Sequence, residues 1–117
     1  MTFNPLHLLQ RLAGGVSGHA IEHAALEKAI HDGDCHLVDV REAHEYAAGR
    51  LPGALNHPLS AFDPSALPTD KPVVLVCQAG GRSLRALQQA HAAGRPDVVH
   101  YAPGTGGWIA RGGRVEK

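Results

Sequence analysis

Residues 73–84 read Val-Val-Leu-Val-Cys-Gln-Ala-Gly-Gly-Arg-Ser-Leu. A β-branched apolar run of strand length leads directly into Cys77, and a short glycine-containing loop follows it. A helix is predicted to begin at Ser83, a favourable N-cap residue type for a helix that continues from Leu84. This strand–loop–helix arrangement predicts a thiol that faces several backbone N–H groups and the N-terminus of a helix.

Such surroundings favour an anionic sulfur, so we expect the pKa of Cys77 to lie below the ordinary value for a thiol. The backbone amides of residues 78–83 are predicted to form an anion cradle, with positive φ at Gly80 and Gly81. Arg82 is predicted to orient the loop or to bind an anionic substrate; a simple pair with a surface carboxylate is the alternative. For Cys77 the alternative is an inert buried cysteine. The loop residues of this candidate site are Gln78, Ala79, Gly80, Gly81, Arg82 and Ser83.

Apolar residues on either side of this stretch alternate between strand and helix spacing. Further strands are predicted at 36–40, 54–57 and 97–101, and helices at 3–13, 20–30, 42–48, 60–67, 83–93 and around Trp108. Continuous apolar strands separated by helices are typical of a parallel sheet covered on both faces, so the pattern predicts an α/β fold. Ligands of such sheets bind beyond the carboxyl ends of the strands, where Cys77 is expected to lie.

Length and composition limit the function classes. The 117 residues suffice for one domain and are too few for two. Eleven basic residues balance eleven acidic ones, so no overall field is expected to attract nucleic acid or an anionic membrane. No apolar run reaches the ~18–20 residues of a membrane span, and the N-terminus lacks the features of a signal peptide. Two cysteines are too few for a disulfide scaffold. We therefore expect a cytoplasmic protein.

Three motifs in this order resemble those of the rhodanese family. They are Leu-Val-Asp-Val-Arg-Glu with Glu-Tyr and Gly-Arg-Leu-Pro-Gly-Ala-Leu-Asn within residues 37–56, the active-site-like loop at 76–83, and Gly-Thr-Gly-Gly-Trp at 104–108. The resemblance covers residues 19–115. It implies a three-layer α/β/α fold with a five-stranded, mainly parallel sheet. On this basis we expect a rhodanese-like domain over residues 19–117 and an N-terminal helical extension over residues 1–18.

The resemblance also implies sulfurtransferase chemistry with Cys77 as the nucleophile. The cysteine would accept a sulfane sulfur from thiosulfate or a similar donor, become a persulfide, and pass the sulfur to cyanide, a thiol or a protein acceptor. No cofactor or metal is expected, and the state expected in solution is a monomer or a weak homodimer. Gln78 stands where many family members carry arginine.

Two other functions remain open. The first is a persulfide carrier or sensing module that receives sulfur without turning it over; it also needs Cys77. The second is a cysteine phosphatase or an arsenate reductase, which uses a loop one residue longer than the four residues between Cys77 and Arg82. The shorter loop is expected to be cramped for a tetrahedral oxyanion.

Three residues outside the loop are candidates for supporting roles. Asp39 and Arg41 follow the neighbouring predicted strand and are expected to fix loops by hydrogen bonds or ion pairs, or to contact substrate. Glu45 is a candidate partner for Arg41. Trp108 is expected either to line the mouth of the site or to pack in the core.

Cys35 precedes one predicted strand whereas Cys77 follows another. In a parallel pair of strands the two thiols then lie at opposite ends, roughly 15 Å apart, which is beyond the ~7 Å limit for a disulfide. A structural role is therefore expected for Cys35. His19 with His23, and His31 with Cys35, are four residues apart, but no spacing fixes further metal ligands, so surface histidines are expected.

An apolar stripe runs along the predicted first helix, residues 3–13. It consists of Phe3, Leu6, Leu9 and Leu12. We expect this stripe to pack against its own domain; docking of a partner or of a second copy is the alternative.

Overall fold

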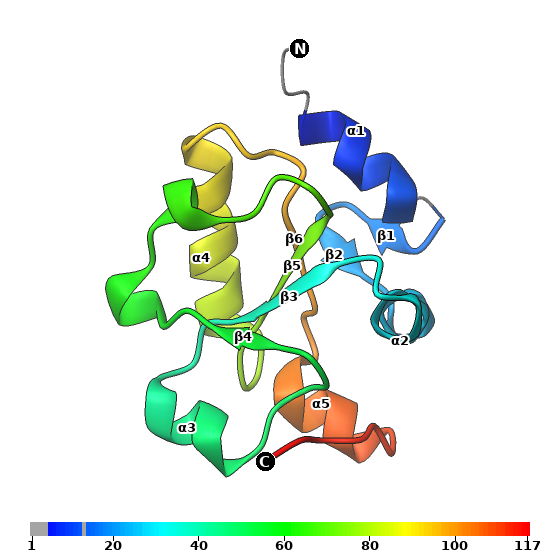
Figure 1. Cartoon of the computed structure of the whole chain (residues 1–117), viewed down its shortest axis with the longest axis vertical. Helices are drawn as coiled ribbons and strands as arrows, with labels where there is room; N and C mark the ends of the chain where they lie inside the picture. Colours follow the sequence, from blue (N-terminus) through cyan, green and yellow to red (C-terminus); the bar gives the residue numbers. More distant parts are fainter. Residues whose placement is uncertain (1–4, 13) are drawn as a thin grey trace.

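The strand that leads to Cys77 is an inner strand of a six-stranded sheet (Figure 1). The computed structural model describes residues 5–12 and 14–117. In it, β5 (Val73–Val76) lies between β3 (His36–Asp39) and β6 (Val99–His100), parallel to both. All residues of β5 are buried, because other elements cover both faces of the sheet. The predicted α/β fold is therefore confirmed.

The sheet has the strand order β1-β2-β6-β5-β3-β4. At one edge β4 (Leu55–Asn56) runs parallel to β3, and on the other side of β5, β2 (Ala20–Ile21) runs parallel to β6. The sixth strand, beyond the five expected, is β1 (Val16–Ser17), which pairs antiparallel with β2. The sheet is thus mainly parallel, as predicted, with one added hairpin strand.

The predicted helix 20–30 is wrong at its start. Ala20 pairs with His100 in the sheet, and α2 (His23–Asp32) begins only after Glu22. Ala20 and Ile21 fit helical spacing as well as strand spacing, and a two-residue strand is too short to show its own period. Pairing with β6 decides between the two.

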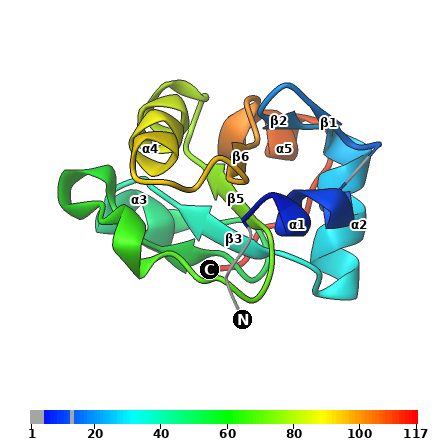
Figure 2. The ribbon, with the colours of Figure 1, turned by 90° about the horizontal axis from the view of Figure 1, so that it is seen from above.

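Side chains of β5 alternate between two cores, as the two-residue repeat of a strand requires. Val73 and Leu75 pack with Cys77 on the face covered by α4 (Gly81–Ala92). Val74 and Val76 face the side of α2 and of α5 (Gly104–Ala110). Figure 2 shows α4 and α2 on opposite sides of the sheet, so the three-layer arrangement is confirmed.

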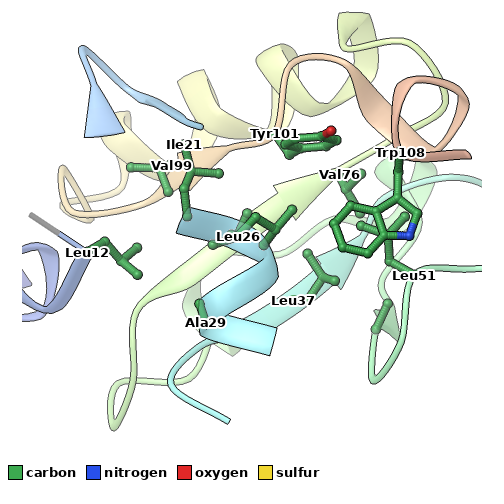
Figure 3. Close-up of a cluster of buried hydrophobic side chains, with 12 residues drawn as sticks. Leu12, Ile21, Leu26, Ala29, Leu37, Leu51, Val76, Val99, Tyr101 and Trp108 are labelled. Atoms are coloured by element: carbon green, nitrogen blue, oxygen red, sulfur yellow. The ribbon is translucent and has the colours of Figure 1, made fainter. Parts of the chain in front are cut away.

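The core on the α2 and α5 side joins distant parts of the chain (Figure 3). Leu26 of α2 is fully buried, and Trp108 of α5 is 4% exposed. The ring of Tyr101, just after β6, lies edge-on to Trp108 at a centroid distance of 6.2 Å. This packing fixes α5, whose first turn contacts the candidate site.

Shorter elements surround the sheet. α3 (Ala43–Ala48) follows β3. The predicted helix 60–67 is instead two 3-10 turns, η2 (Leu59–Ala61) and η3 (Pro64–Ala66). Pro64 has no amide hydrogen and so cannot continue a helix from the preceding residues; it begins the second turn after Asp63, whose side chain accepts a hydrogen bond from the Ser65 amide.

The first predicted helix, residues 3–13, is described over residues 5–12. It comprises α1 (Pro5–Leu9) followed by the 3-10 turn η1 (Gln10–Leu12), and Phe3 and Ala13 lie outside the described residues. Leu12 packs in the core on the α2 side, so this segment does pack on its own domain. The predicted stripe is wrong at Leu6, which is 53% exposed, whereas Leu8 is buried.

No helix within residues 5–12 and 14–117 has the length and apolar character needed to cross a membrane.

Candidate active site

Cys77 follows β5 directly, at the carboxyl end of the strand. Its side chain packs in the α4-side core and is 1% exposed. The residue nevertheless forms part of the lining of an open pocket, which consists of Cys77, Gln78, Ala79, Gly81, Arg82 and Arg85. A thiol in this position is sheltered from bulk water while lying beside a space that a small substrate can enter.

Hydrogen-bonding groups lie beside the sulfur of Cys77. The Gly80 amide donates to Sγ at 3.0 Å, and the Ser83 hydroxyl oxygen lies 3.6 Å from Sγ. Burial raises the pKa of Cys77, but the Ser83 hydroxyl and the amides of Ser83, Ala79 and Gly80 outweigh it, so the pKa is lowered from its ordinary value. The site therefore favours a thiolate.

The loop depends on Gly80. This residue has φ 100°, and a Cβ built on it would lie 2.5 Å from the Ala102 carbonyl oxygen. Gly80 is also the N-cap of α4. The predictions of positive φ at Gly81 and of an N-cap at Ser83 are therefore wrong: the turn at Gly80 completes the reversal, so the helix begins at Gly81, two residues earlier than expected.

The first turn of α5 holds the backbone of the loop. The Thr105 amide donates to the Cys77 carbonyl at 2.8 Å, and the Gly106 amide donates to the Gln78 carbonyl at 3.1 Å. Gly104 permits this approach, since a Cβ there would lie 2.4 Å from the Gln78 carbonyl oxygen. The sequence analysis did not predict that Thr105 would hold the backbone at Cys77. The glycine-rich turn at 104–108 was the pattern from which this contact could have been inferred.

Arg82 is bound to α3. Its two terminal nitrogens donate to Glu45 Oε1 and Oε2 at 2.6 and 2.9 Å. Glu45 also accepts a hydrogen bond from the Glu42 amide at the start of α3. The hydrogen bonds from Arg82 lower the pKa of Glu45 to about 2. The structure shows this pair with a carboxylate; a role of Arg82 in orienting the loop or binding an anionic substrate stays a prediction.

Arg41 does not pair with Glu45, so that expectation is wrong. Its side chain turns back onto the carboxylate of Asp39, with Nη2 2.8 Å from Oδ2. Arg41 also donates to the Gly49 carbonyl at 2.7 Å and to Gln78 Oε1 at 3.4 Å. Asp39 is fully buried, and a buried carboxylate captures the nearest guanidinium in place of a more exposed partner such as Glu45.

Trp108 lies in the core and is absent from the pocket lining at Cys77. Its indole Nε1 donates to the Arg114 carbonyl at 2.8 Å. Of the two expectations for Trp108, the structure shows core packing.

His100 joins the site through Ser83, which sequence reasoning missed. The Nδ1 atom of His100 lies 2.8 Å from Ser83 Oγ, and the residue is 8% exposed. Burial, with a smaller contribution from the charge of His19, lowers the pKa of His100. Ser83 and His100 meet because β5 and β6 are neighbours in the sheet. No local sequence pattern predicts this contact.

Cys35 and Cys77 are both free thiols. Cys35 precedes His36, which pairs with Val73 at the start of β5, so the two thiols lie at opposite ends of the strands, as predicted. Burial, together with the charge of Asp34, raises the pKa of Cys35 to about 11. The two cysteines are therefore opposite in their expected reactivity at neutral pH.

The two predicted pairs, His19 with His23 and His31 with Cys35, are not arranged as metal ligands. His19 precedes β2, outside α2, so it shares no helix face with His23. His23 Nδ1 instead lies 2.7 Å from the Tyr101 hydroxyl, and His31 pairs with Asp32. Across residues 5–12 and 14–117, no group of three or more histidine, cysteine, aspartate or glutamate side chains is arranged to hold a metal ion.

Comparison with known proteins adds sequence relatives. The model of the rhodanese-like domain family matches residues 22–111. A human thiosulfate:glutathione sulfurtransferase is 32% identical over 102 residues, which cover 74% of this chain and 89% of the relative. A tRNA sulfurtransferase of Desulfurococcus amylolyticus is 39% identical over 88 residues, covering 68% of this chain. The chain spans 44%, 18% and 63% of the lengths of relatives from Synechocystis, Desulfurococcus amylolyticus and Bacillus subtilis.

Solved structures of rhodanese-related proteins have a similar fold. A rhodanese-related protein of Thermoplasma volcanium has a TM-score of 0.75 at 28% identity, covering 84% of this chain and 97% of that one. A human single-domain sulfurtransferase, TSTD1, has a TM-score of 0.69 at 30% identity and covers 81% of this chain and 98% of its own.

Proposed function

The chain belongs to the rhodanese-like domain family, and we propose that it is a sulfurtransferase that carries a sulfane sulfur on Cys77. The observation that carries the proposal is the sulfur of Cys77 with the Gly80 amide 3.0 Å away, beside an open pocket. Relatives that are named as sulfurtransferases support it. The donor is thiosulfate or a similar sulfane compound, and the acceptor is cyanide or a thiol.

In the first step the Cys77 thiolate attacks the outer sulfur of thiosulfate. A new S–S bond forms on Cys77, the S–S bond of thiosulfate breaks, and sulfite leaves with the electron pair. The lowered pKa of Cys77 means that no general base is needed to generate the nucleophile. The Gly80 amide and the Ser83 hydroxyl are already in place around the sulfur, so little reorganisation is required.

In the second step the acceptor attacks the outer sulfur of the persulfide. The bond between the two sulfurs breaks, and Cys77 leaves as a thiolate. The same donors that lower the pKa of Cys77 make it a better leaving group, because they stabilise the negative charge that returns to Sγ. One set of donors thus serves both halves of the cycle.

Positive charge at the pocket suits an anionic donor. Arg82 and Arg85 both line the pocket. Glu45 offsets the charge of Arg82, whereas Arg85 is exposed and has no ion pair among residues 5–12 and 14–117. Arg85 is therefore our candidate for attracting thiosulfate into the pocket.

Turnover tests the proposal. We expect the protein to convert thiosulfate and cyanide to sulfite and thiocyanate, and we expect Cys77→Ser to abolish this activity. Cys35→Ser is the matched control, because it removes the other thiol at the opposite end of the strands, and it should retain full activity. Activity that persists in Cys77→Ser would contradict the proposal.

A persulfide carrier without turnover is the second candidate. A Bacillus subtilis relative, YrkF, has "sulfur carrier protein" in its name and is 28% identical over 87 residues. A carrier would load sulfur on Cys77 but show negligible turnover with cyanide. A phosphatase is disfavoured, because Glu45 occupies both terminal nitrogens of Arg82. A cytoplasmic location and a monomeric or weakly dimeric state remain predictions from the sequence.

A further inference from the structure

Three buried polar side chains form a continuous series from β5 through α4 to β6. Cys77 Sγ lies 3.6 Å from Ser83 Oγ, and Ser83 Oγ lies 2.8 Å from His100 Nδ1. Their exposed fractions are 1%, 0% and 8%. The sheet creates this series, because Leu75 of β5 pairs with His100 of β6, two residues before Cys77.

The Ser83 hydroxyl has one hydrogen but three neighbours that can accept it. These are the Gly80 carbonyl at 3.2 Å, His100 Nδ1 at 2.8 Å and Cys77 Sγ at 3.6 Å. A bare Nδ1 at the shortest distance would take the hydrogen and leave the thiolate without it. An Nδ1 that carries a proton must instead donate to Ser83 Oγ. The serine hydrogen then has the Gly80 carbonyl and the sulfur as acceptors, and a thiolate is the stronger of the two because it is charged.

We propose that His100 is a positioning residue for Cys77, which acts by donating from Nδ1–H to Ser83 so that the Ser83 hydroxyl donates to the thiolate. This inference rests on the proposed role of Cys77 as an ionised nucleophile. Hydrogen bonds in such a chain polarise one another, so the first bond strengthens the second. His100 thus favours the thiolate in the resting enzyme and again when Cys77 leaves the persulfide.

The imidazole acts in its neutral form. Burial lowers the pKa of His100, and a neutral ring with its hydrogen on Nδ1 is sufficient as a donor. The titratable groups around it belong to three elements: Cys77 after β5, His19 before β2, whose carbonyl accepts the His100 amide hydrogen, and His91 of α4, whose ring packs edge-on against that of His19 at 4.4 Å.

The pH profile of Cys77 alkylation by iodoacetamide tests this role without any sulfur donor. Asparagine places its amide nitrogen near the position of Nδ1, whereas phenylalanine fills similar space without a donor. In a Cys35→Ser background, we expect His100→Phe to decrease the acid dissociation constant of Cys77 roughly 3- to 10-fold, the effect of one lost hydrogen bond. His100→Asn should remain within about twofold of the parent.

Two controls separate positioning from packing. His91→Phe makes the same chemical change at a histidine of α4 that bonds to the Val98 carbonyl, and it should leave the Cys77 profile unchanged. In a Ser83→Ala background, His100→Phe should have no further effect, because the link to the sulfur is already missing. If His100→Asn is as impaired as His100→Phe, or if His100→Phe leaves the profile unchanged, the inference is overturned.

The protonation of the two His100 ring nitrogens can be measured in the wild-type protein, so this test needs no variant. Nitrogen-15 chemical shifts should show His100 protonated at Nδ1 when Cys77 is ionised; protonation at Nε2 alone would overturn the inference. Failure here is distinguishable from failure of the proposed function. If Cys77 alkylates as a thiolate while His100 has no effect, only this inference is lost. If Cys77 titrates as an ordinary thiol, the proposed function is contradicted.

Discussion

The carboxylate of Glu45 accepts a hydrogen bond from each terminal nitrogen of Arg82, at 2.6 and 2.9 Å. Glu45 belongs to the first turn of α3, and Arg82 to the first turn of α4. The pair therefore ties the loop after β5 to the segment that follows β3. Because Cys77 lies at the base of that loop, the pair connects the segment that carries the Cys77 sulfur to the segment after a second strand of the sheet.

Arg82→Ala is expected to lower kcat/KM for thiosulfate roughly 5- to 30-fold, which corresponds to about 1–2 kcal/mol of lost transition-state stabilisation. The substitution removes both the tie to Glu45 and a positive charge that attracts the Cys77 thiolate. Steady-state kinetics measure the effect. Glu45→Gln is the matched variant, because it weakens the tie but keeps the arginine, and its loss should be smaller. Unchanged kinetics in Arg82→Ala would remove the assigned role.

Because of the Glu45–Arg82 pair, we expect the difference in stability between wild type and Glu45→Gln to depend on pH. The pKa of Glu45 is lowered to about 2 in the folded protein, so its contribution is fully present above the ordinary glutamate range and is lost as the pH falls towards 2. Urea unfolding of wild type and Glu45→Gln should therefore differ at pH 7 and converge near pH 2. Since the pair is partly exposed, the difference at pH 7 should be about 0.2–1 kcal/mol. A difference that grows at acid pH would contradict the assignment.

Two adjacent glycines are expected to respond in opposite ways to alanine. Gly80→Ala combines φ 100° with a Cβ 2.5 Å from the Ala102 carbonyl oxygen, so it should destabilise the protein by about 2–4 kcal/mol. Gly81→Ala has open space around the new methyl group and lies in α4, so it should be neutral or stabilise by up to about 1 kcal/mol. Urea midpoints measure both. Equal effects would show that the loop geometry is wrong.

Arg85→Ala is expected to raise the KM for thiosulfate several-fold, on the order of 3- to 10-fold, with kcat little changed, because a long-range charge attracts the anion without touching the reacting atoms. The effect should shrink at high salt. Arg111→Ala removes another exposed arginine, at the end of α5 away from the pocket lining, and should leave KM unchanged. A fall in kcat alone would place Arg85 in a different role.

What the sequence predicted well is local. The apolar run before Cys77, the glycine loop and the following helix are consecutive in the chain, so their strand–loop–helix order follows from spacing alone. Even there, the predicted start of the helix at Ser83 is wrong. The positive φ lies at Gly80, so α4 already begins at Gly81. Local pattern shows that a glycine is present but not which glycine adopts positive φ.

The side-chain contacts of the site could not be predicted from the sequence, because they join segments that are distant along the chain. The partners of Arg82 and Ser83 are 37 and 17 residues away along the chain, and they meet only because β3, β5 and β6 are neighbours in the sheet. The expected pair of Arg41 with Glu45 does not form, because the buried carboxylate of Asp39 holds Arg41 instead. Burial, which spacing does not show, selects between competing partners.

Mass spectrometry of the intact protein after incubation with thiosulfate tests the central claim most directly. The account predicts that the protein gains the mass of one sulfur atom, that peptide mapping places it on Cys77, and that cyanide removes it. Cys35, whose pKa is raised to about 11, should remain unmodified. A protein that gains no sulfur, or that gains it on Cys35, would contradict the account.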